Sequence, residues 1–121
     1  MKALSRCILA AIALTIGASA TGDQGSRREL EVTASRFRFE PASLEVTEGD
    51  RIALTLRSAD GTHGFAIPDF QVKATIPKGG SPVTVEFVAA KAGTFKFECS
   101  EYCGSGHRQM KGRLVVAARA R

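Results

Sequence analysis

The chain has 121 residues, of which 44% are hydrophobic, and a formal net charge of +5. This length fits one small domain, and the hydrophobic content is sufficient for a single core. The lysines and arginines alternate with apolar residues instead of forming a block, which indicates a solvated face and argues against nucleic acid as a partner.

The N-terminal residues 1–20 have the features of a signal peptide. Lys2 and Arg6 form a short basic region, the apolar run CILAAIALTIG follows, and the small residues ASA end at Ala20. The apolar run is shorter than the roughly 20 residues needed to span a bilayer, which favours cleavage over retention as an anchor. We therefore expect an exported protein, located in the periplasm or at the outer face of the cytoplasmic membrane.

The segment TGDQGSRR, residues 21–28, is small, polar and charged, and is predicted to be a flexible lead-in to a domain at residues 29–121. In that domain apolar and polar residues alternate with a period of two, which predicts half-buried strands. The predicted strands cover residues 36–41, 51–57, 83–88, 94–99 and 112–118.

Turn sequences separate the predicted strands. They are TEGD, SADG, IPKGG and KAG, and no segment has a sustained apolar period of 3.6 residues. Six to eight short strands with frequent turns predict an all-β fold, a two-sheet β-sandwich of Greek-key type.

One stretch near the C-terminus, FKFECSEYCGSGHRQMKG, concentrates metal-binding side chains. Cys99, Cys103, His107 and Met110 fall within twelve positions, between one predicted strand and the next. Thiolate, imidazole and thioether are soft ligands that suit copper better than magnesium, calcium or manganese. The stretch therefore predicts a copper site in a loop held at both ends by a sheet.

Two glycines and a distant histidine extend this prediction. Gly104 and Gly106 are expected to take positive φ and let the loop wrap around a bound centre. His63 lies far upstream, at the start of another strand, and would have to reach the site across the sandwich. If the leader is removed with Cys7 and Met1, every remaining cysteine, histidine and methionine belongs to this one candidate site.

The residues alone leave several sites open. A mononuclear blue-copper site would use His63, Cys103, His107 and Met110, and Cys99 would then have no role as a ligand. Alternatively, the two thiolates could bridge two copper ions. Cys99 and Cys103 could also form a disulfide, which is common in exported proteins, although a disulfide gives no reason for the histidine and methionine that follow. A zinc site with both histidines has no use for Met110.

The motif CSEYCGSGHRQM resembles the CuA motif of cytochrome c oxidase subunit II and of nitrous oxide reductase. The upstream segment THGFAIPDFQVKATIPKG is similar to the first-histidine segment of the same family. The resemblance covers roughly residues 30–117 and implies a cupredoxin fold with two copper ions. By position it implies bridging thiolates from Cys99 and Cys103, terminal ligands from His63 and His107, a weak ligand from Met110, and the backbone carbonyl of Glu101 as a further ligand.

The function implied is single-electron transfer in a respiratory chain by a dinuclear CuA-type centre. We find no pattern of a substrate pocket or a general acid–base pair, so the chain by itself is not expected to be an enzyme or to take a small-molecule substrate. The expected partner is a c-type cytochrome or another redox protein. The alternatives are a docked subunit through which a membrane terminal oxidase receives electrons, and a copper carrier or assembly protein.

Overall fold

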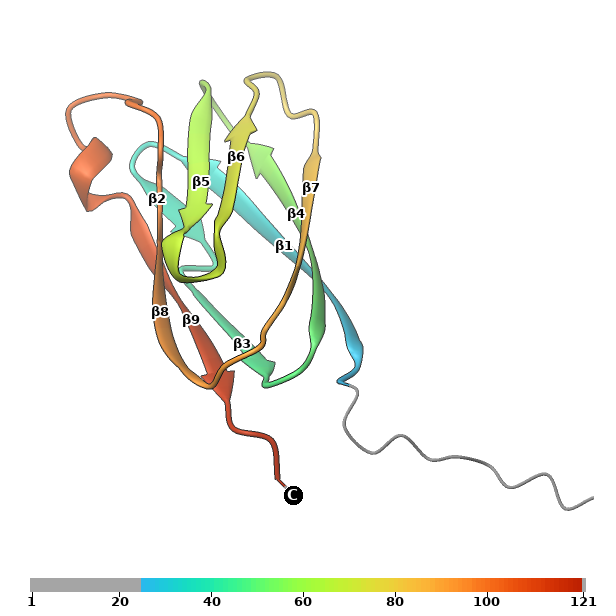
Figure 1. Ribbon diagram of the computed structural model, residues 1–121. Coiled ribbons are helices and arrows are strands. Elements are labelled where there is room, and N and C mark those ends of the chain that lie inside the picture. Colours follow the sequence, from blue (N-terminus) through green and yellow to red (C-terminus); the bar gives the residue numbers. More distant parts are fainter. Residues whose placement is uncertain (1–24, 121) are drawn as a thin grey trace, which may run out of the picture.

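The computed structural model describes residues 25–120, so the predicted signal peptide and residues 21–24 of the predicted lead-in lie outside the described residues. Residues 25–120 form nine strands and two short 3₁₀ helices, arranged as two sheets packed face to face (Figure 1). No helix in this part of the chain is long and apolar enough to cross a membrane.

The smaller sheet has four strands in the order β2-β1-β4-β7. They are β1 (Arg27–Ser35), β2 (Arg38–Glu40), β4 (Arg51–Ser58) and β7 (Val83–Val88). Strand β1 runs parallel to β4, while β2 and β7 are antiparallel to their neighbours. Because β1 begins at Arg27, the ordered sheet starts two residues before the expected domain boundary, and the last two residues of the predicted lead-in belong to a strand.

The larger sheet has five strands in the order β3-β9-β8-β5-β6. They are β3 (Ser43–Thr47), β5 (His63–Ile67), β6 (Val72–Ile76), β8 (Gly93–Glu98) and β9 (Lys111–Ala117). Strand β3 is parallel to β9, and the other pairs are antiparallel. This sheet places β8, which leads into the predicted copper loop, directly beside β5, which begins with His63.

The two-sheet, all-β sandwich predicted from the sequence is confirmed. Strands β4, β7, β8 and β9 coincide with runs predicted from alternation. The run at residues 36–41 forms only the three-residue β2, because Arg36 and Phe37 lie in the turn before it. Nine strands replace the expected six to eight. Strand β5 is buried along its whole length, so it has no alternation from which it could be predicted.

Three phenylalanine rings at the centre of the core connect the strands that carry the candidate site. Phe39, Phe65 and Phe97 lie with ring centroids 5.2 to 5.6 Å apart. Aromatic pairs in such tilted or edge-on geometry contribute about 0.5–1.5 kcal/mol each beyond the area they bury. The contact of Phe65 with Phe97 therefore fixes β5 against β8, and with them the positions of His63 and Cys99.

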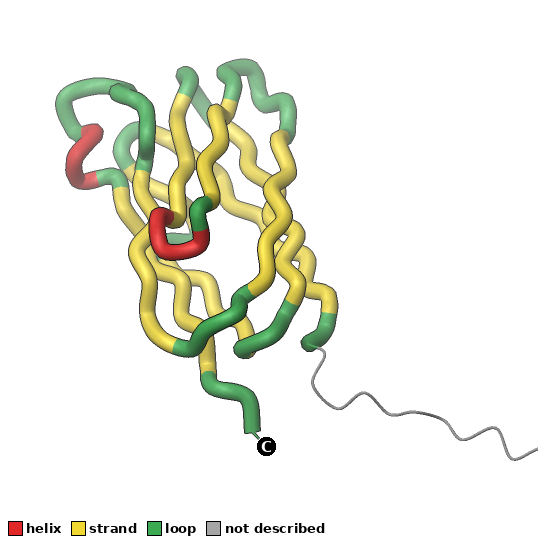
Figure 2. Tube along the Cα trace, viewed as in Figure 1, coloured by secondary structure: helices red, strands yellow, loops and turns green. Residues whose placement is uncertain are grey.

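The loop between β8 and β9 projects from one end of the sandwich and contains the 3₁₀ helix η2 (His107–Gln109) (Figure 2). The second 3₁₀ helix, η1 (Pro68–Phe70), joins β5 to β6. The last described residues lie at the opposite end of the sandwich. The candidate site therefore sits at one end of a rigid scaffold, away from the C-terminal end of the chain.

Candidate metal centre

The loop from Cys99 to Met110 is closed by its own backbone. The N–H of Cys99 donates to the carbonyl of Met110 at 3.1 Å, so the two ends of the loop are joined where β8 and β9 separate. Within the loop, the N–H of His107 donates to the carbonyl of Gly104, also at 3.1 Å. Such closure holds the side chains of the loop in fixed positions relative to the sheet.

The side chains of the loop bring three sulfur atoms and an imidazole together. Cys103 Sγ lies 3.6 Å from Cys99 Sγ, 3.7 Å from Met110 Sδ and 3.6 Å from His107 Nδ1. Both cysteines are free thiols. The arrangement places Cys103 at the centre of the group, in contact with each of the other three side chains.

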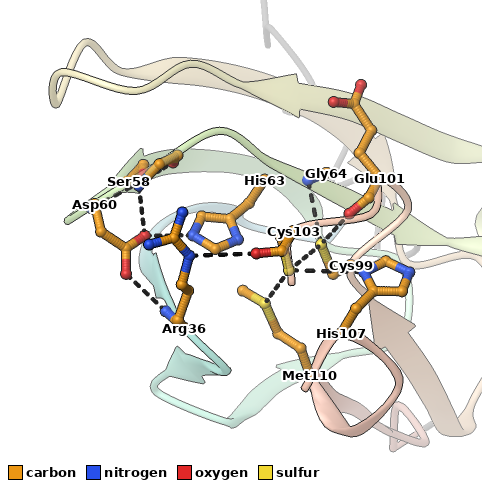
Figure 3. A network of polar contacts seen from close by, with 11 residues as sticks. Arg36, Ser58, Asp60, His63, Gly64, Cys99, Glu101, Cys103, His107 and Met110 are labelled. Atoms are coloured by element: carbon orange, nitrogen blue, oxygen red, sulfur yellow. Dashed lines mark hydrogen bonds and ion pairs between the residues drawn. The ribbon is translucent and has the colours of Figure 1, made fainter. Parts of the chain in front are cut away.

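His63 lies beside this group, at the start of β5. Its ring is completely buried, and its donor nitrogen and the sulfurs of Cys99 and Cys103 lie within 4.8 Å of one another. Figure 3 shows His63 and His107 on opposite sides of the two cysteines. The Nδ1 atom of His63 is buried and has no hydrogen-bond partner. An unpaired buried nitrogen is costly, and a metal ion would satisfy it.

The other nitrogen of His63 is held by Asp60, three residues earlier. Nε2 of His63 lies 2.5 Å from Oδ1 of Asp60. Desolvation acts to raise the pKa of this carboxyl, but hydrogen bonds from His63 and from the backbone N–H groups of Arg36 and Gly61 outweigh it and lower the pKa. An ionised Asp60 can only accept, so Nε2 donates to it, and Nδ1 is the ring nitrogen that remains for a metal ion.

Arg36 joins the two sides of the site. Its backbone N–H donates to Asp60 Oδ2 at 2.8 Å, and its Nε donates to the carbonyl of Cys103 at 3.2 Å. One residue of the turn before β2 thus links the carboxylate behind His63 to the centre of the loop. In the sequence, Arg36 begins the predicted strand at residues 36–41 and Asp60 lies in the predicted turn SADG, so neither residue was predicted to support the site.

The two thiols differ in their surroundings. The backbone N–H of Gly64 donates to the buried Cys99 Sγ at 3.4 Å, whereas Cys103 is only half-buried. Burial, together with the neighbouring Cys99, raises the pKa of the Cys103 thiol to about 11. Without a metal, Cys103 is therefore protonated at neutral pH, and metal binding must release its proton.

Glu101 turns its backbone carbonyl, and not its side chain, toward the sulfur atoms. Its carbonyl oxygen lies 3.0 Å from Cys99 Sγ. Its carboxylate points away from the sulfurs, as Figure 3 shows, and accepts a hydrogen bond from the Thr75 hydroxyl on β6. The backbone carbonyl is therefore the oxygen that this residue offers to the site.

The two loop glycines have different roles. Gly104 has φ +138°, as expected, whereas Gly106 has φ −93°, so the expectation of positive φ is wrong for Gly106. A Cβ on Gly106 would overlap the ring of Phe37, and a Cβ on Gly104 would lie 2.8 Å from the same ring. Phe37 covers the loop from the turn before β2, and both glycines leave room for it.

The comparison with known proteins agrees with this geometry. Over residues 7–116 the sequence matches the family described as cupredoxin-like domain. The chain belongs to the cupredoxin-like family. This is a copper-binding family, and a cupredoxin domain is an electron carrier module.

The cupredoxin is similar to the copper domains that the sequence motif indicated. Cytochrome c oxidase subunit 2 from Thermus thermophilus is 32% identical over 85 residues, which cover 70% of this chain and 62% of the relative. Nitrous-oxide reductase from Cupriavidus necator is 32% identical over 99 residues, covering 78% of this chain and 15% of the enzyme. The cupredoxin thus spans less than two thirds of the length of either relative.

A solved structure supports the fold. The periplasmic domain of subunit II of cytochrome oxidase (CoxB) of Bradyrhizobium japonicum superposes with a TM-score of 0.66, covering 74% of this chain and 83% of that domain at 24% identity. At this identity the likeness establishes the cupredoxin fold. The ligand roles rest on the geometry and donor chemistry described above.

Proposed function

We propose that this cupredoxin is a copper-binding electron-transfer protein with a dinuclear CuA-type centre. The proposed ligands are His63, Cys99, the Glu101 carbonyl, Cys103, His107 and Met110. The observation that carries the proposal is the buried, unpartnered Nδ1 of His63, which faces two free thiols, while His107 lies on their other side (Figure 3). This donor set fits copper, since every soft side chain in the described residues points to one place.

The arrangement of the thiols supports two metal ions over one. A blue-copper site needs one thiolate, and here two thiols lie between two imidazoles, so each sulfur can bridge. Two copper ions held by Cys99 and Cys103 would share one electron and would exchange single electrons with a partner. Cys99 then has a role that a mononuclear site would not give it.

The protein around the ligands supports electron transfer by limiting rearrangement. Asp60 fixes the tautomer and orientation of His63, and Arg36 ties the same carboxylate to the Cys103 carbonyl. His63 and Met110 are fully buried, so water has little access to this side of the site. Ligands held in place, and a side of the site from which water is largely excluded, keep the reorganisation on gaining or losing an electron small.

Similarity to a periplasmic domain of an oxidase subunit supports export and a role in a respiratory chain. We propose a c-type cytochrome or another redox protein as the partner, outside the cytoplasmic membrane. Metal analysis with electron paramagnetic resonance tests the core of the proposal. We expect about two coppers per chain and a mixed-valence signal that is split by both nuclei. One copper per chain, with a signal localised on one nucleus, would contradict the dinuclear centre.

The similarity to oxidase subunit II favours one second candidate, in which the domain docks on a membrane oxidase and receives electrons for it. Cell fractionation separates the two. Recovery in membranes, in association with a haem-containing oxidase, would identify the docked subunit. Recovery in the soluble fraction, with reversible reduction by a c-type cytochrome, would identify the free carrier.

A further inference from the structure

An open pocket of about 650 Å³ lies on the outer face of the five-stranded sheet, beside the copper loop. A row of paired residues crosses its floor: Lys73 on β6 opposes Ala66 on β5, which opposes Glu98 on β8, which opposes Lys111 on β9. Their neighbours Val72 and Cys99 are buried in the core, so the side chains of Lys73, Glu98 and Lys111 lie on the outer face, with the buried Ala66 between them.

The pocket is hollow because its central residue is small. Ala66 lies between the longer side chains of Lys73 and Glu98, and the loop residues His107 and Arg108 form another wall. The hollow is therefore a product of strand register and of the loop folding beside the sheet. Neither is a local property of one segment.

The charge of the pocket is positive. Lys73, Arg108 and Lys111 are exposed and take part in none of the ion pairs found within residues 25–120. The one carboxylate in the lining, Glu98, is paired with Lys96 at 3.1 Å. Three unpaired cations around a hollow attract a surface that carries carboxylates.

The pocket also leads to the candidate metal centre. Cys99, His107 and Met110 contribute to its wall. His107 is half-buried, whereas His63 is completely buried behind Asp60. A molecule seated in the pocket would therefore approach the centre from the side of His107.

We propose that this pocket is the docking surface for an acidic redox partner, which presents carboxylates to Lys73, Arg108 and Lys111 and exchanges an electron through His107. In each encounter the reduced centre loses one electron and the prosthetic group of the partner gains it, with no proton transferred and no bond made or broken. The electron-transfer part rests on the proposed function. The docking itself needs no metal, because the three cations belong to the protein.

The first experiment maps anion binding on the metal-free protein. The probe is the paramagnetic hexacyanochromate(III) trianion, which broadens the amide NMR signals near which it binds. We expect broadening around Lys73, Arg108 and Lys111, and its loss in the triple variant Lys73→Gln/Arg108→Gln/Lys111→Gln. The matched control is Arg28→Gln, which removes an exposed cation of β1 in the other sheet. It should leave the broadening unchanged.

The single variant Lys73→Gln tests the same surface without changing the copper loop, because Lys73 lies on β6. It should weaken the broadening at Arg108 and Lys111 even if the triple variant folds poorly. Broadening that is uniform over the surface, or confined to other lysines and arginines, would overturn the proposal. Broadening at the pocket together with binding of an acidic c-type cytochrome elsewhere would identify a small-anion site and equally overturn it.

The second experiment measures electron transfer from the reduced, copper-loaded protein. Oxidation by the hexacyanoferrate(III) trianion should slow as ionic strength rises from about 0.01 M to about 1 M, since the Debye length falls from about 30 Å to about 3 Å. The triple variant should react about tenfold more slowly than the parent at low ionic strength. At high ionic strength the two rates should converge, and Arg28→Gln should match the parent throughout.

The tris(phenanthroline)cobalt(III) trication should show the opposite dependence on ionic strength. Equal rates for parent and triple variant with the trianion would overturn the proposal, as would faster reaction with a basic cytochrome than with an acidic one. If the protein holds no redox-active copper, the proposed function fails. The NMR experiment on the metal-free protein still decides whether the pocket docks an acidic partner.

Discussion

The ring of His63 and the carboxylate of Asp60 meet through Nε2 and Oδ1 at 2.5 Å, and this contact turns the other ring nitrogen toward the two cysteines. The two residues are three positions apart: Asp60 lies in the turn between β4 and β5, and His63 is the first residue of β5. Asp60 thus orients the His63 ring so that Nδ1 is the nitrogen available to a metal ion. This relationship gives the first prediction.

Replacing Asp60 should weaken copper binding without removing a ligand. In Asp60→Ala the imidazole of His63 loses the acceptor that fixes its tautomer, and we expect copper affinity to fall by about 10–100-fold, as is typical when such a partner is lost. Competition with a chelator of Cu(I) measures the affinity. The control is Asp69→Ala, an exposed carboxylate in η1. Equal affinities for Asp60→Ala and the parent would show that His63 needs no support.

Cys99→Ser should remove the delocalised copper pair. Only one bridging thiolate would remain, and a mononuclear site could form from His63, Cys103, His107 and Met110. We expect about one copper per chain and a resonance signal localised on one nucleus. If the variant retained the two-copper spectrum of the parent, the assignment of Cys99 as a bridging ligand would be wrong.

Met110→Leu should be milder. The thioether is a weak ligand that tunes the potential more than it holds the metal, so copper should be retained and the reduction potential should shift. Leucine has nearly the volume of methionine, so the fully buried position should tolerate it at a cost below about 1.5 kcal/mol. Voltammetry gives the potential and thermal unfolding the stability. Complete loss of copper from a folded variant would contradict the weak-ligand role.

Gly106→Ala should destabilise the copper loop through Phe37. The added methyl group would overlap the Phe37 ring, and overpacking of this kind typically costs about 1–3 kcal/mol. Chemical denaturation of the metal-free protein measures the loss. The double variant Gly106→Ala/Phe37→Ala removes the clash. Its loss of free energy of unfolding should therefore be smaller than the sum of the losses in the two single variants. Strict additivity would show that Phe37 does not constrain the loop.

Copper should stabilise the fold, because the metal-free protein leaves the buried Nδ1 of His63 unpaired. At a free copper concentration about 100 times the dissociation constant, linkage adds about 2.7 kcal/mol to the free energy of unfolding. Thermal unfolding with and without copper tests this. In His63→Ala the gain should shrink sharply, and an undiminished gain would mean that copper binds without this ring.

The fold class was predictable, and the side chains that meet in the loop could be proposed as ligands, because both depend on short-range patterns. Alternation along residues 51–57 and 83–88 revealed β4 and β7, and the spacing of Cys99, Cys103 and His107 lies within one loop. Strand β5 could not be predicted in this way, because it is buried along its whole length and its residues do not alternate between apolar and polar. The run at residues 36–41 overstated β2, because a turn occupies its first two residues.

The sequence by itself determined the sandwich, the soft donor set of the loop and the need for a distant histidine, because hydrophobic period and ligand spacing are written along the chain. Only the tertiary structure decided that Asp60 orients His63, that Arg36 links Asp60 to the Cys103 carbonyl, and that Phe37 covers Gly106. It also decided the basic pocket. These contacts join segments from different strands and turns, and their meeting depends on strand order and register, which no local pattern specifies.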